Sequence, residues 1–330
     1  MIGGMQTSSR RAAAFAITAL LVLVAAPVLA APELVEVPLT DGPVTGTFVT
    51  PAGARNFPAI VLLGGSEGGA PVADARRFAE HGYAALALGY FGLGALPKQL
   101  RAIPLETVTR GIDWLAARPE VDASRIGIEG GSKGAELALL VASREPRIRA
   151  TALVAPSAYV WFGLDFTSGA PETSSWSAAG APVPYIPSDA AADADVGRAF
   201  GTGGQISFRD TFARSFAAAT PAIRERATIP AERVAGPIIC IAGDDDNEWD
   251  SPGACATIEA RRRAAHRDAG DAVVIEPGAG HALPFSGKPV PRSFPAGPAT
   301  LVLGGTPDAN ARGGADAFAK IIAFFDRTLR

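Results

Sequence analysis

Residues 125–143 read RIGIEGGSKGAELALLVAS, a short apolar run followed by a glycine-flanked serine and a helix-forming run. A serine held on a sharp strand-to-helix turn needs small residues two positions before it and two positions after it, as Gly130 and Gly134 are here. The stretch therefore predicts a strand over Arg125 to Glu129, an exposed Ser132 on the turn, and a helix over Lys133 to Ser143.

The rest of the chain repeats this alternation of short apolar runs and longer helical patterns, which is typical of a mostly parallel sheet with helices on both faces. We expect one α/β domain over residues 31–330, with the α/β-hydrolase fold and an eight-stranded sheet. The other expected strands are Glu33 to Val37, Val44 to Thr50, Ala59 to Leu63, Ala84 to Leu88, Ala150 to Val154, Ile238 to Ala242 and Ala272 to Glu276. The other expected helices are Ala73 to Glu80, Leu105 to Ala117, Cys255 to Ala269 and Ala315 to Leu329.

One segment interrupts the alternation. Residues 157–234 are rich in Ser, Ala, Gly and Pro and lie between the sixth and seventh expected strands, so they are interpreted as an inserted lid. Its aromatic residues Trp161, Trp176 and Tyr185 are predicted to include residues that line an acyl pocket, although packing of the lid on the sheet is the more ordinary role for any single one. The Pro-rich stretch 284–298 is predicted to be a surface loop.

A second glycine-flanked serine, Ser66, follows the strand that ends at Leu63. Glycines and Pro71 follow Ser66 before any helix can begin, whereas Ser132 heads a helix whose N-terminus favours a developing negative charge. Ser132 is therefore the predicted nucleophile. The backbone N–H groups of Ser66 and Lys133 are predicted to bind the oxyanion of a tetrahedral intermediate.

The base is selected from three histidines. His81 lies where a helix ends, and His266 lies on an arginine-rich helix face, so both have ordinary structural roles. His281 follows the last expected strand, where a loop can carry it over the sheet to Ser132. The acid should lie between Ser132 and His281 in sequence, and residues 244–246 offer three adjacent Asp side chains after a strand. Position in the sequence does not decide which of these three Asp residues is the acid.

Composition limits the partners. The net charge is −3, and the longest basic run is Arg261 to Arg263, so nucleic acid is not an expected partner. This chemistry needs neither a metal nor a cofactor, and we expect a small-molecule acyl substrate.

The N-terminus resembles an export signal. Arg10 and Arg11 precede the apolar run 12–26, and Ala30 and Ala31 suit a signal peptidase, so residues 1–30 are interpreted as a cleaved leader. An uncleaved membrane anchor is the alternative. We expect an exported enzyme, periplasmic or secreted, with no stable membrane insertion after cleavage. Export would place Cys240 and Cys255 in an oxidising compartment, which favours a disulfide over two buried thiols.

Together these residues resemble the bile-acid acyltransferase and acyl-CoA thioester hydrolase family, in its short bacterial form. The resemblance rests on LGGSEGG at 63–69, SKGAEL at 132–137, GDDD at 243–246 with Trp249 and Ser251, and Gly280-His281. In that family the Asp three positions before the Trp is catalytic, which implies Asp246. A Cys nucleophile marks its acyltransferases and a Ser marks its hydrolases, so Ser132 implies transfer of the acyl group to water.

Two other classes of function compete with a serine esterase or thioesterase. The glycine-rich loop from Gly64 to Gly69 could bind a dinucleotide in an oxidoreductase, but no acidic residue ends the next strand to bind a ribose. A non-catalytic surface protein could keep the same fold. The intact set of Ser132, Asp246 and His281 argues against that alternative.

Overall fold

The structure is a computed structural model that describes residues 1–4, 32–40, 42–53, 55–165 and 170–330. The predicted leader lies outside the described residues except for its first four. The chain divides into two units, residues 1–31 and 32–330, and the second unit contains every helix and strand described. Within the described ranges no helix is both long and apolar enough to cross a bilayer.

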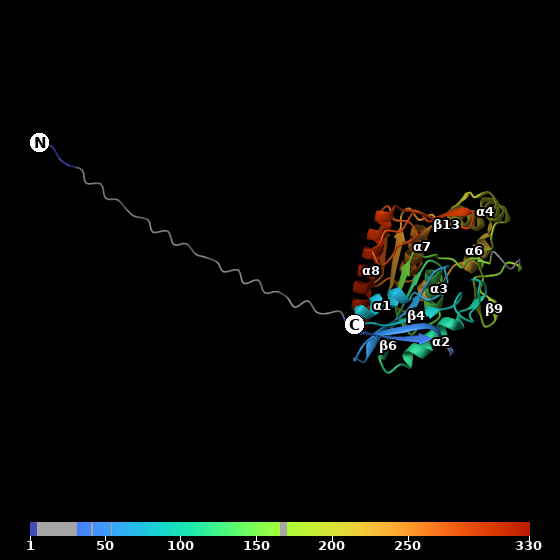
Figure 1. Cartoon of the computed structure of the whole chain (residues 1–330), viewed down its shortest axis with the longest axis horizontal. Helices are drawn as coiled ribbons and strands as arrows, with labels where there is room; N and C mark the ends of the chain where they lie inside the picture. The colour runs from blue at the N-terminus through green and yellow to red at the C-terminus, as the bar shows by residue number, and fades with distance from the viewer. Residues whose placement is uncertain (5–31, 41, 54, 166–169) are drawn as a thin grey trace. The chain divides into compact units, whose positions relative to one another are not determined.

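An eight-stranded sheet forms the centre of this second unit (Figure 1). Its strand order is β1-β2-β4-β3-β6-β7-β11-β12, antiparallel at β1 and β2 and parallel from β4 onward. The expected α/β-hydrolase fold and its eight strands are confirmed. The strands are β1 (Leu34–Leu39), β2 (Thr45–Pro51), β3 (Phe57–Leu63), β4 (Ala84–Gly89), β6 (Val121–Gly131), β7 (Ile148–Val154), β11 (Ile238–Gly243) and β12 (Ala272–Glu276).

Two apolar layers cover the two faces of the sheet. Successive side chains of a strand point to opposite faces, so in β3 Val61 and Leu63 pack in one layer, and Ile60 and Leu62 pack in the other. The first layer lies beneath α2 (Glu106–Ala116), α3 (Lys133–Ala142) and α7 (Ser251–Ala264). The second lies beneath α1 (Val72–Glu80) and α8 (Pro307–Leu329), which runs along one side of the sheet (Figure 1).

The strand order places a crevice beside β3. The chain leaves β3 to form β4 on one side and later forms β6 on the other. In open α/β sheets ligands bind at such a switch point, outside the carboxyl ends of the strands. Ser66 follows β3 and Ser132 follows β6, so both serines lie at this crevice.

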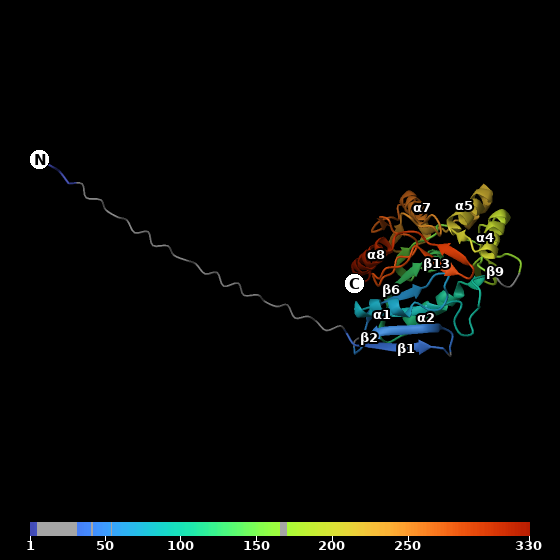
Figure 2. The ribbon, with the colours of Figure 1, turned by 45° about the horizontal axis from the view of Figure 1, so that its top comes forward.

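The predicted insertion lies between β7 and β11, which are neighbours in the sheet. It holds short elements rather than a second core sheet, and a strand pair joins it to the C-terminal part of the chain, where β10 pairs with β14. The β13–β14 hairpin lies beside α4 in Figure 2. The short strand β5 (Ile103–Pro104) pairs with β8 of the insertion, and the C-terminal hairpin consists of β13 (Ser293–Ala296) and β14 (Ala299–Val302). The elements of the insertion are β8 (Trp176–Ala178), β9 (Ala181–Pro182), α4 (Ala190–Thr202), β10 (Gln205–Ile206), α5 (Phe208–Ala218), α6 (Pro221–Ala227) and the 3₁₀ turn η1 (Ala231–Arg233).

The prediction that 284–298 is only a surface loop was wrong. The stretch contains β13, which turns through Gly297 and pairs antiparallel with β14. The prolines of this stretch argued against a strand, because proline is depleted in strands and is found mainly in edge strands.

Candidate active site

Ser132 occupies a strained turn between β6 and α3. Its φ is 53° and its ψ is −122°, a conformation that side chains other than glycine rarely adopt. The flanking glycines make the turn possible, because a Cβ on Gly130 would lie 2.2 Å from the Gly134 carbonyl oxygen and one on Gly134 would lie 2.2 Å from that of Leu63. The Ser132 N–H donates to the Val154 carbonyl oxygen at 2.9 Å. These constraints expose the Ser132 hydroxyl at the N-terminus of α3.

His281 reaches this hydroxyl from the loop after β12. Its Nε2 lies 2.7 Å from Ser132 Oγ, its Nδ1 lies 2.9 Å from Asp246 Oδ2, and its N–H donates to the Leu303 carbonyl oxygen. Burial lowers the pKa of His281, but the charge and hydrogen bond of Asp246, together with the nearby Glu248 and Glu67, outweigh burial and raise it above its usual value. The imidazole therefore has a basic Nε2 directed at the serine.

The three adjacent carboxylates after β11 have different partners. Asp244 accepts a hydrogen bond from the Gly278 N–H at 2.6 Å, and Asp245 pairs with Arg292 and accepts from the Gly305 N–H. Asp246 is fully buried and is the one that contacts His281. The carboxylate of Asp246 also accepts from Ser251 Oγ at 2.5 Å and from the amides of Glu248 and Trp249 at 2.8 and 3.2 Å.

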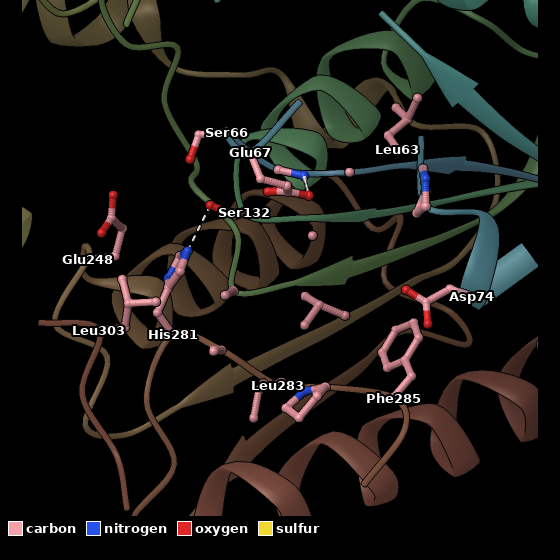
Figure 3. A pocket seen from close by; sticks show the side chains of 18 of the residues that line it. Leu63, Ser66, Glu67, Asp74, Ser132, Glu248, His281, Leu283, Phe285 and Leu303 are labelled. Atoms are coloured by element: carbon pink, nitrogen blue, oxygen red, sulfur yellow. Dashed lines mark hydrogen bonds between the residues drawn. The ribbon is translucent and has the colours of Figure 1, made fainter. Parts of the chain in front are cut away.

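Two backbone amides near Ser132 are the predicted oxyanion donors. The N–H groups of Ser66 and Lys133 donate no hydrogen bond to any residue that the structure describes. Figure 3 shows Ser66 on the other side of Ser132 from His281. Both predicted oxyanion donors are thus free to bind a substrate oxygen. The neighbouring Gly65 N–H donates to the Glu67 carboxylate at 2.8 Å, so this amide of the glycine-rich loop already has an acceptor.

The Lys133 side chain anchors the start of α3 to the insertion. Its Nζ is buried and donates to Glu136 Oε2 and Ser175 Oγ, both at 2.9 Å. Glu136 Oε1 in turn accepts from the Trp176 indole at 2.7 Å and from the Trp161 amide at 3.1 Å. This network was not predicted, because Glu136 and Trp176 lie 40 residues apart in sequence.

A cavity of about 580 Å³ opens over Ser132 and His281 (Figure 3). Four carboxyl groups line it, and none of the described residues that line it is Lys or Arg. No group of three or more His, Cys, Asp or Glu side chains in the described ranges is arranged to hold a metal ion. The carboxyl groups are those of Glu67, Asp74, Glu129 and Glu248, and the apolar wall includes Leu283, Phe285, Phe294, Leu301 and Leu303.

Glu248 lies beside the histidine and was missed by sequence reasoning. Burial, reinforced by Asp246 and opposed by His281 and Lys133, raises the pKa of Glu248 to about 7. Its Oε2 is buried and has no hydrogen-bond partner among the described residues.

The three aromatic residues predicted to include acyl-pocket residues do not line this cavity, and their role in an acyl pocket stays a prediction. Trp176 is fully buried in the core, where its indole binds Glu136. Trp161 lines a separate cavity of about 480 Å³, and Tyr185 lines a small one with Ile223. Ser175 and Trp176 of the insertion contact α3, and the β13–β14 hairpin supplies Phe294 and Leu301 to the wall of the cavity.

Cys240 on β11 and Cys255 on α7 form a disulfide with a Cα–Cα separation of 5.6 Å. This separation is within the usual range for bridged cysteines. The bond ties the strand that precedes the three Asp residues to the helix that follows them.

Comparison with known proteins identifies relatives of this arrangement. The profile of the family described as BAAT / acyl-CoA thioester hydrolase C terminal matches residues 103–330. Mouse acyl-coenzyme A thioesterase 6 is 30% identical over 307 residues, which make up 91% of this chain and 66% of that protein. Mouse acyl-coenzyme A amino acid N-acyltransferase 1 is 28% identical over 250 residues, or 75% of this chain and 54% of that protein.

Solved structures share the fold at low identity. The acylaminoacyl peptidase of Pyrococcus horikoshii is similar with a TM-score of 0.54 and 14% identity, over 90% of this chain and 42% of that one. The chain spans just under two thirds of the length of the mouse thioesterase. The family profile covers more than half of the chain, so the chain belongs to the BAAT / acyl-CoA thioester hydrolase C-terminal family.

Proposed function

We propose that this protein is a serine hydrolase that cleaves an ester or thioester acyl bond through an acyl-enzyme on Ser132. The observation that carries the proposal is the continuous hydrogen-bonded chain from Asp246 through His281 to Ser132, with links of 2.9 and 2.7 Å. A nucleophile, a base and a group that orients the base are the parts that acyl transfer requires. Membership of a family that contains acyl-CoA thioesterases supports the same chemistry.

The reaction would proceed in two halves. Ser132 Oγ attacks the acyl carbonyl carbon while His281 Nε2 takes its proton, and the N–H groups of Ser66 and Lys133 bind the oxyanion. His281 then gives the proton to the leaving oxygen or sulfur, which departs and leaves the acyl group on Ser132. Water repeats the sequence, with His281 accepting its proton and returning it to Ser132 as the acid is released.

Labelling with a fluorophosphonate probe tests this assignment. Ser132→Ala should abolish labelling and hydrolysis of activated esters. Ser66→Ala is the matched control, since it removes a glycine-flanked serine at the same crevice but keeps the main-chain N–H, so it should still label. Equal loss in both variants, or labelling that survives Ser132→Ala, would overturn the choice of nucleophile.

We also propose that the enzyme acts outside the cytoplasm, on the basis of the arginine pair, apolar run and small residues within the first 31 positions. N-terminal sequencing of the protein recovered from a periplasmic fraction should then begin at Ala31. Recovery of the full-length chain in the cytoplasm would contradict it.

A further inference from the structure

The cavity over Ser132 has an unusual charge for a site that handles acyl groups. Four carboxyl groups from four segments of the chain line it, and the described lining contains neither Lys nor Arg. Two of these groups, Glu67 and Glu248, lie close enough to His281 to raise its pKa. The other two are Asp74 of α1 and Glu129 of β6, and Asp74 is close enough to Glu129 to raise its pKa. Figure 3 shows Asp74 beside Phe285, on the side away from Glu248.

Glu129 is the decisive residue. It is 5% exposed, and its carboxyl group makes no hydrogen bond or ion pair with any residue that the structure describes. Its neighbours across the strand pairs are Leu62 and Ala152, so it interrupts an apolar layer on a central strand. Burial, together with the nearby charge of Asp74, raises the pKa of Glu129 well above its usual value.

An unpaired buried carboxyl group is costly to ionise. Without a partner such a group tends to hold its proton, which is the reason that burial raises the pKa of Glu129. Glu129 lines a cavity rather than solid core, so a group entering that cavity can supply the missing partner. A cation is the partner that would stabilise the ionised form of Glu129 and also pair with Asp74.

Asp74 is the second carboxyl group beside Glu129, and its ion pair with Arg77 is weak. Arg77 lies 3.8 Å from it, but both side chains are more than a third exposed, and ion pairs of this kind are weak. Burial raises the pKa of Asp74 above its usual value, with Arg77 opposing and Glu67 adding to the rise. Asp74 can therefore still accept a charged partner from the cavity side.

The position of Glu129 sets the geometry of a ligand. It precedes Ser132 by three residues, and β6 ends at Gly131, so the Cα atoms of Glu129 and Ser132 lie at most about 10 Å apart at roughly 3.3 Å per residue. The leaving group must lie against His281 Nε2 to receive its proton, on the Glu248 side of the cavity (Figure 3). The acyl group then extends the other way, toward Glu129 and Asp74.

We propose that the substrate carries a positively charged amine at the far end of its acyl group, and that Glu129 and Asp74 bind this ammonium while Ser132 attacks the carbonyl carbon. The inference rests on the proposed hydrolase function and narrows it to one substrate class. Anionic acyl groups are disfavoured by the same carboxylates, and neutral alkyl acyl groups leave Glu129 without a partner.

Three p-nitrophenyl esters with the same five methylene groups test the proposal: the 6-aminohexanoate, the heptanoate and the singly charged pimelate. With the wild-type enzyme we expect kcat/KM for the aminohexanoate to exceed that for the heptanoate by tenfold or more, with the pimelate below both. Glu129→Gln should bring the ratio of aminohexanoate to heptanoate close to one. Glu80→Gln, which removes an exposed charge at the end of α1 outside the cavity lining, is the matched control and should leave the ratio unchanged.

A binding measurement separates the failure of this inference from the failure of the hydrolase assignment. The Ser132→Ala protein is titrated calorimetrically with 6-aminohexanamide, heptanamide and the monoamide of pimelic acid, none of which requires turnover. Preference for the amine that Glu129→Gln abolishes supports the subsite even if no ester is hydrolysed, whereas hydrolysis of all three esters without amine preference overturns the subsite and keeps the hydrolase. Asp74→Asn provides the same comparison if Glu129→Gln does not fold.

Discussion

Replacing Asp246 by Asn should change which nitrogen of His281 carries the proton. The carboxylate accepts from His281 Nδ1 and Ser251 Oγ on one oxygen and from two backbone amides on the other. In the Asn variant the amide oxygen keeps the backbone contacts, so the NH₂ group faces His281 Nδ1. An NH₂ group only donates, and Nδ1 must then accept. The proton therefore moves to Nε2, which can no longer take one from Ser132.

The size of the effect follows from the burial of the pair. Asp246 is 0% exposed and the His281 side chain is 9% exposed, so water cannot easily restore the tautomer. The same exchange in another Ser-His-Asp enzyme lowers kcat by about 10⁴. At about 1.36 kcal/mol per factor of ten, this corresponds to roughly 5.4 kcal/mol of lost transition-state stabilisation.

The neighbouring acids provide matched controls. Asp244→Asn and Asp245→Asn each remove the same charge one or two positions away, but they weaken loop contacts to Gly278, Gly305 and Arg292 rather than the contact to His281. Each contact is worth about 1 kcal/mol, so kcat should fall by no more than about tenfold. Folding of each purified variant is checked by circular dichroism, and kcat is measured on one p-nitrophenyl ester. If a control variant loses several orders of magnitude while Asp246→Asn stays active, Asp246 is not the acid.

Three further predictions concern pH, redox state and the insertion. The kcat/KM should rise with pH through an apparent pKa above about 6.5, because the unprotonated His281 is the active form and its pKa is raised; a rate that is flat below neutrality, with chemistry limiting, contradicts this. Thiol titration of the denatured exported protein should find Cys240 and Cys255 unreactive until reduced, and reduction should lower the free energy of unfolding by about 3 kcal/mol for a separation of 15 residues; two reactive thiols before reduction would refute the bond. Trp176→Ala should lower the free energy of unfolding by about 3–5 kcal/mol, as measured by denaturant titration, while an altered preference for acyl chain length would instead assign Trp176 to the pocket.

Most of the fold could be predicted because its signals are local. Parallel strands buried on both faces are continuous apolar runs, and each expected strand overlaps a strand of the central sheet. The short strands could not be predicted, since β10 is only Gln205–Ile206 and exists through its pairing with Thr300 and Leu301 of β14, which lie far along the chain. Their stability comes from tertiary contacts that no local pattern records.

The residues of the candidate site also fall into those that the sequence predicts locally and those that depend on tertiary packing. Ser132 and His281 could be predicted from the glycine-flanked serine and the strand order, and in the structure His281 Nε2 lies 2.7 Å from Ser132 Oγ. The choice among residues 244–246 depends on how the chain turns after Gly243, where a Cβ would lie 2.3 Å from the Ala279 carbonyl oxygen, and this packing is invisible in the sequence. Glu129 did leave a signal, because an acidic residue within the apolar run 125–131 contradicts the pattern of a central strand.

The insertion contacts the start of α3, and its described aromatic residues do not line the cavity over Ser132. The Trp176 indole and the Ser175 hydroxyl instead hold the buried Lys133–Glu136 pair. That pair occupies the first turn of α3, whose N-terminus carries Ser132 and the Lys133 amide. A shift of the insertion would therefore move an oxyanion donor through this pair, and it would also move the cavity wall at Leu301, which pairs with Ile206 of the insertion. Since a displacement of about 1 Å in a reacting group can cost on the order of 10² in rate, the network ties catalysis to the packing of the insertion without any contact to the substrate.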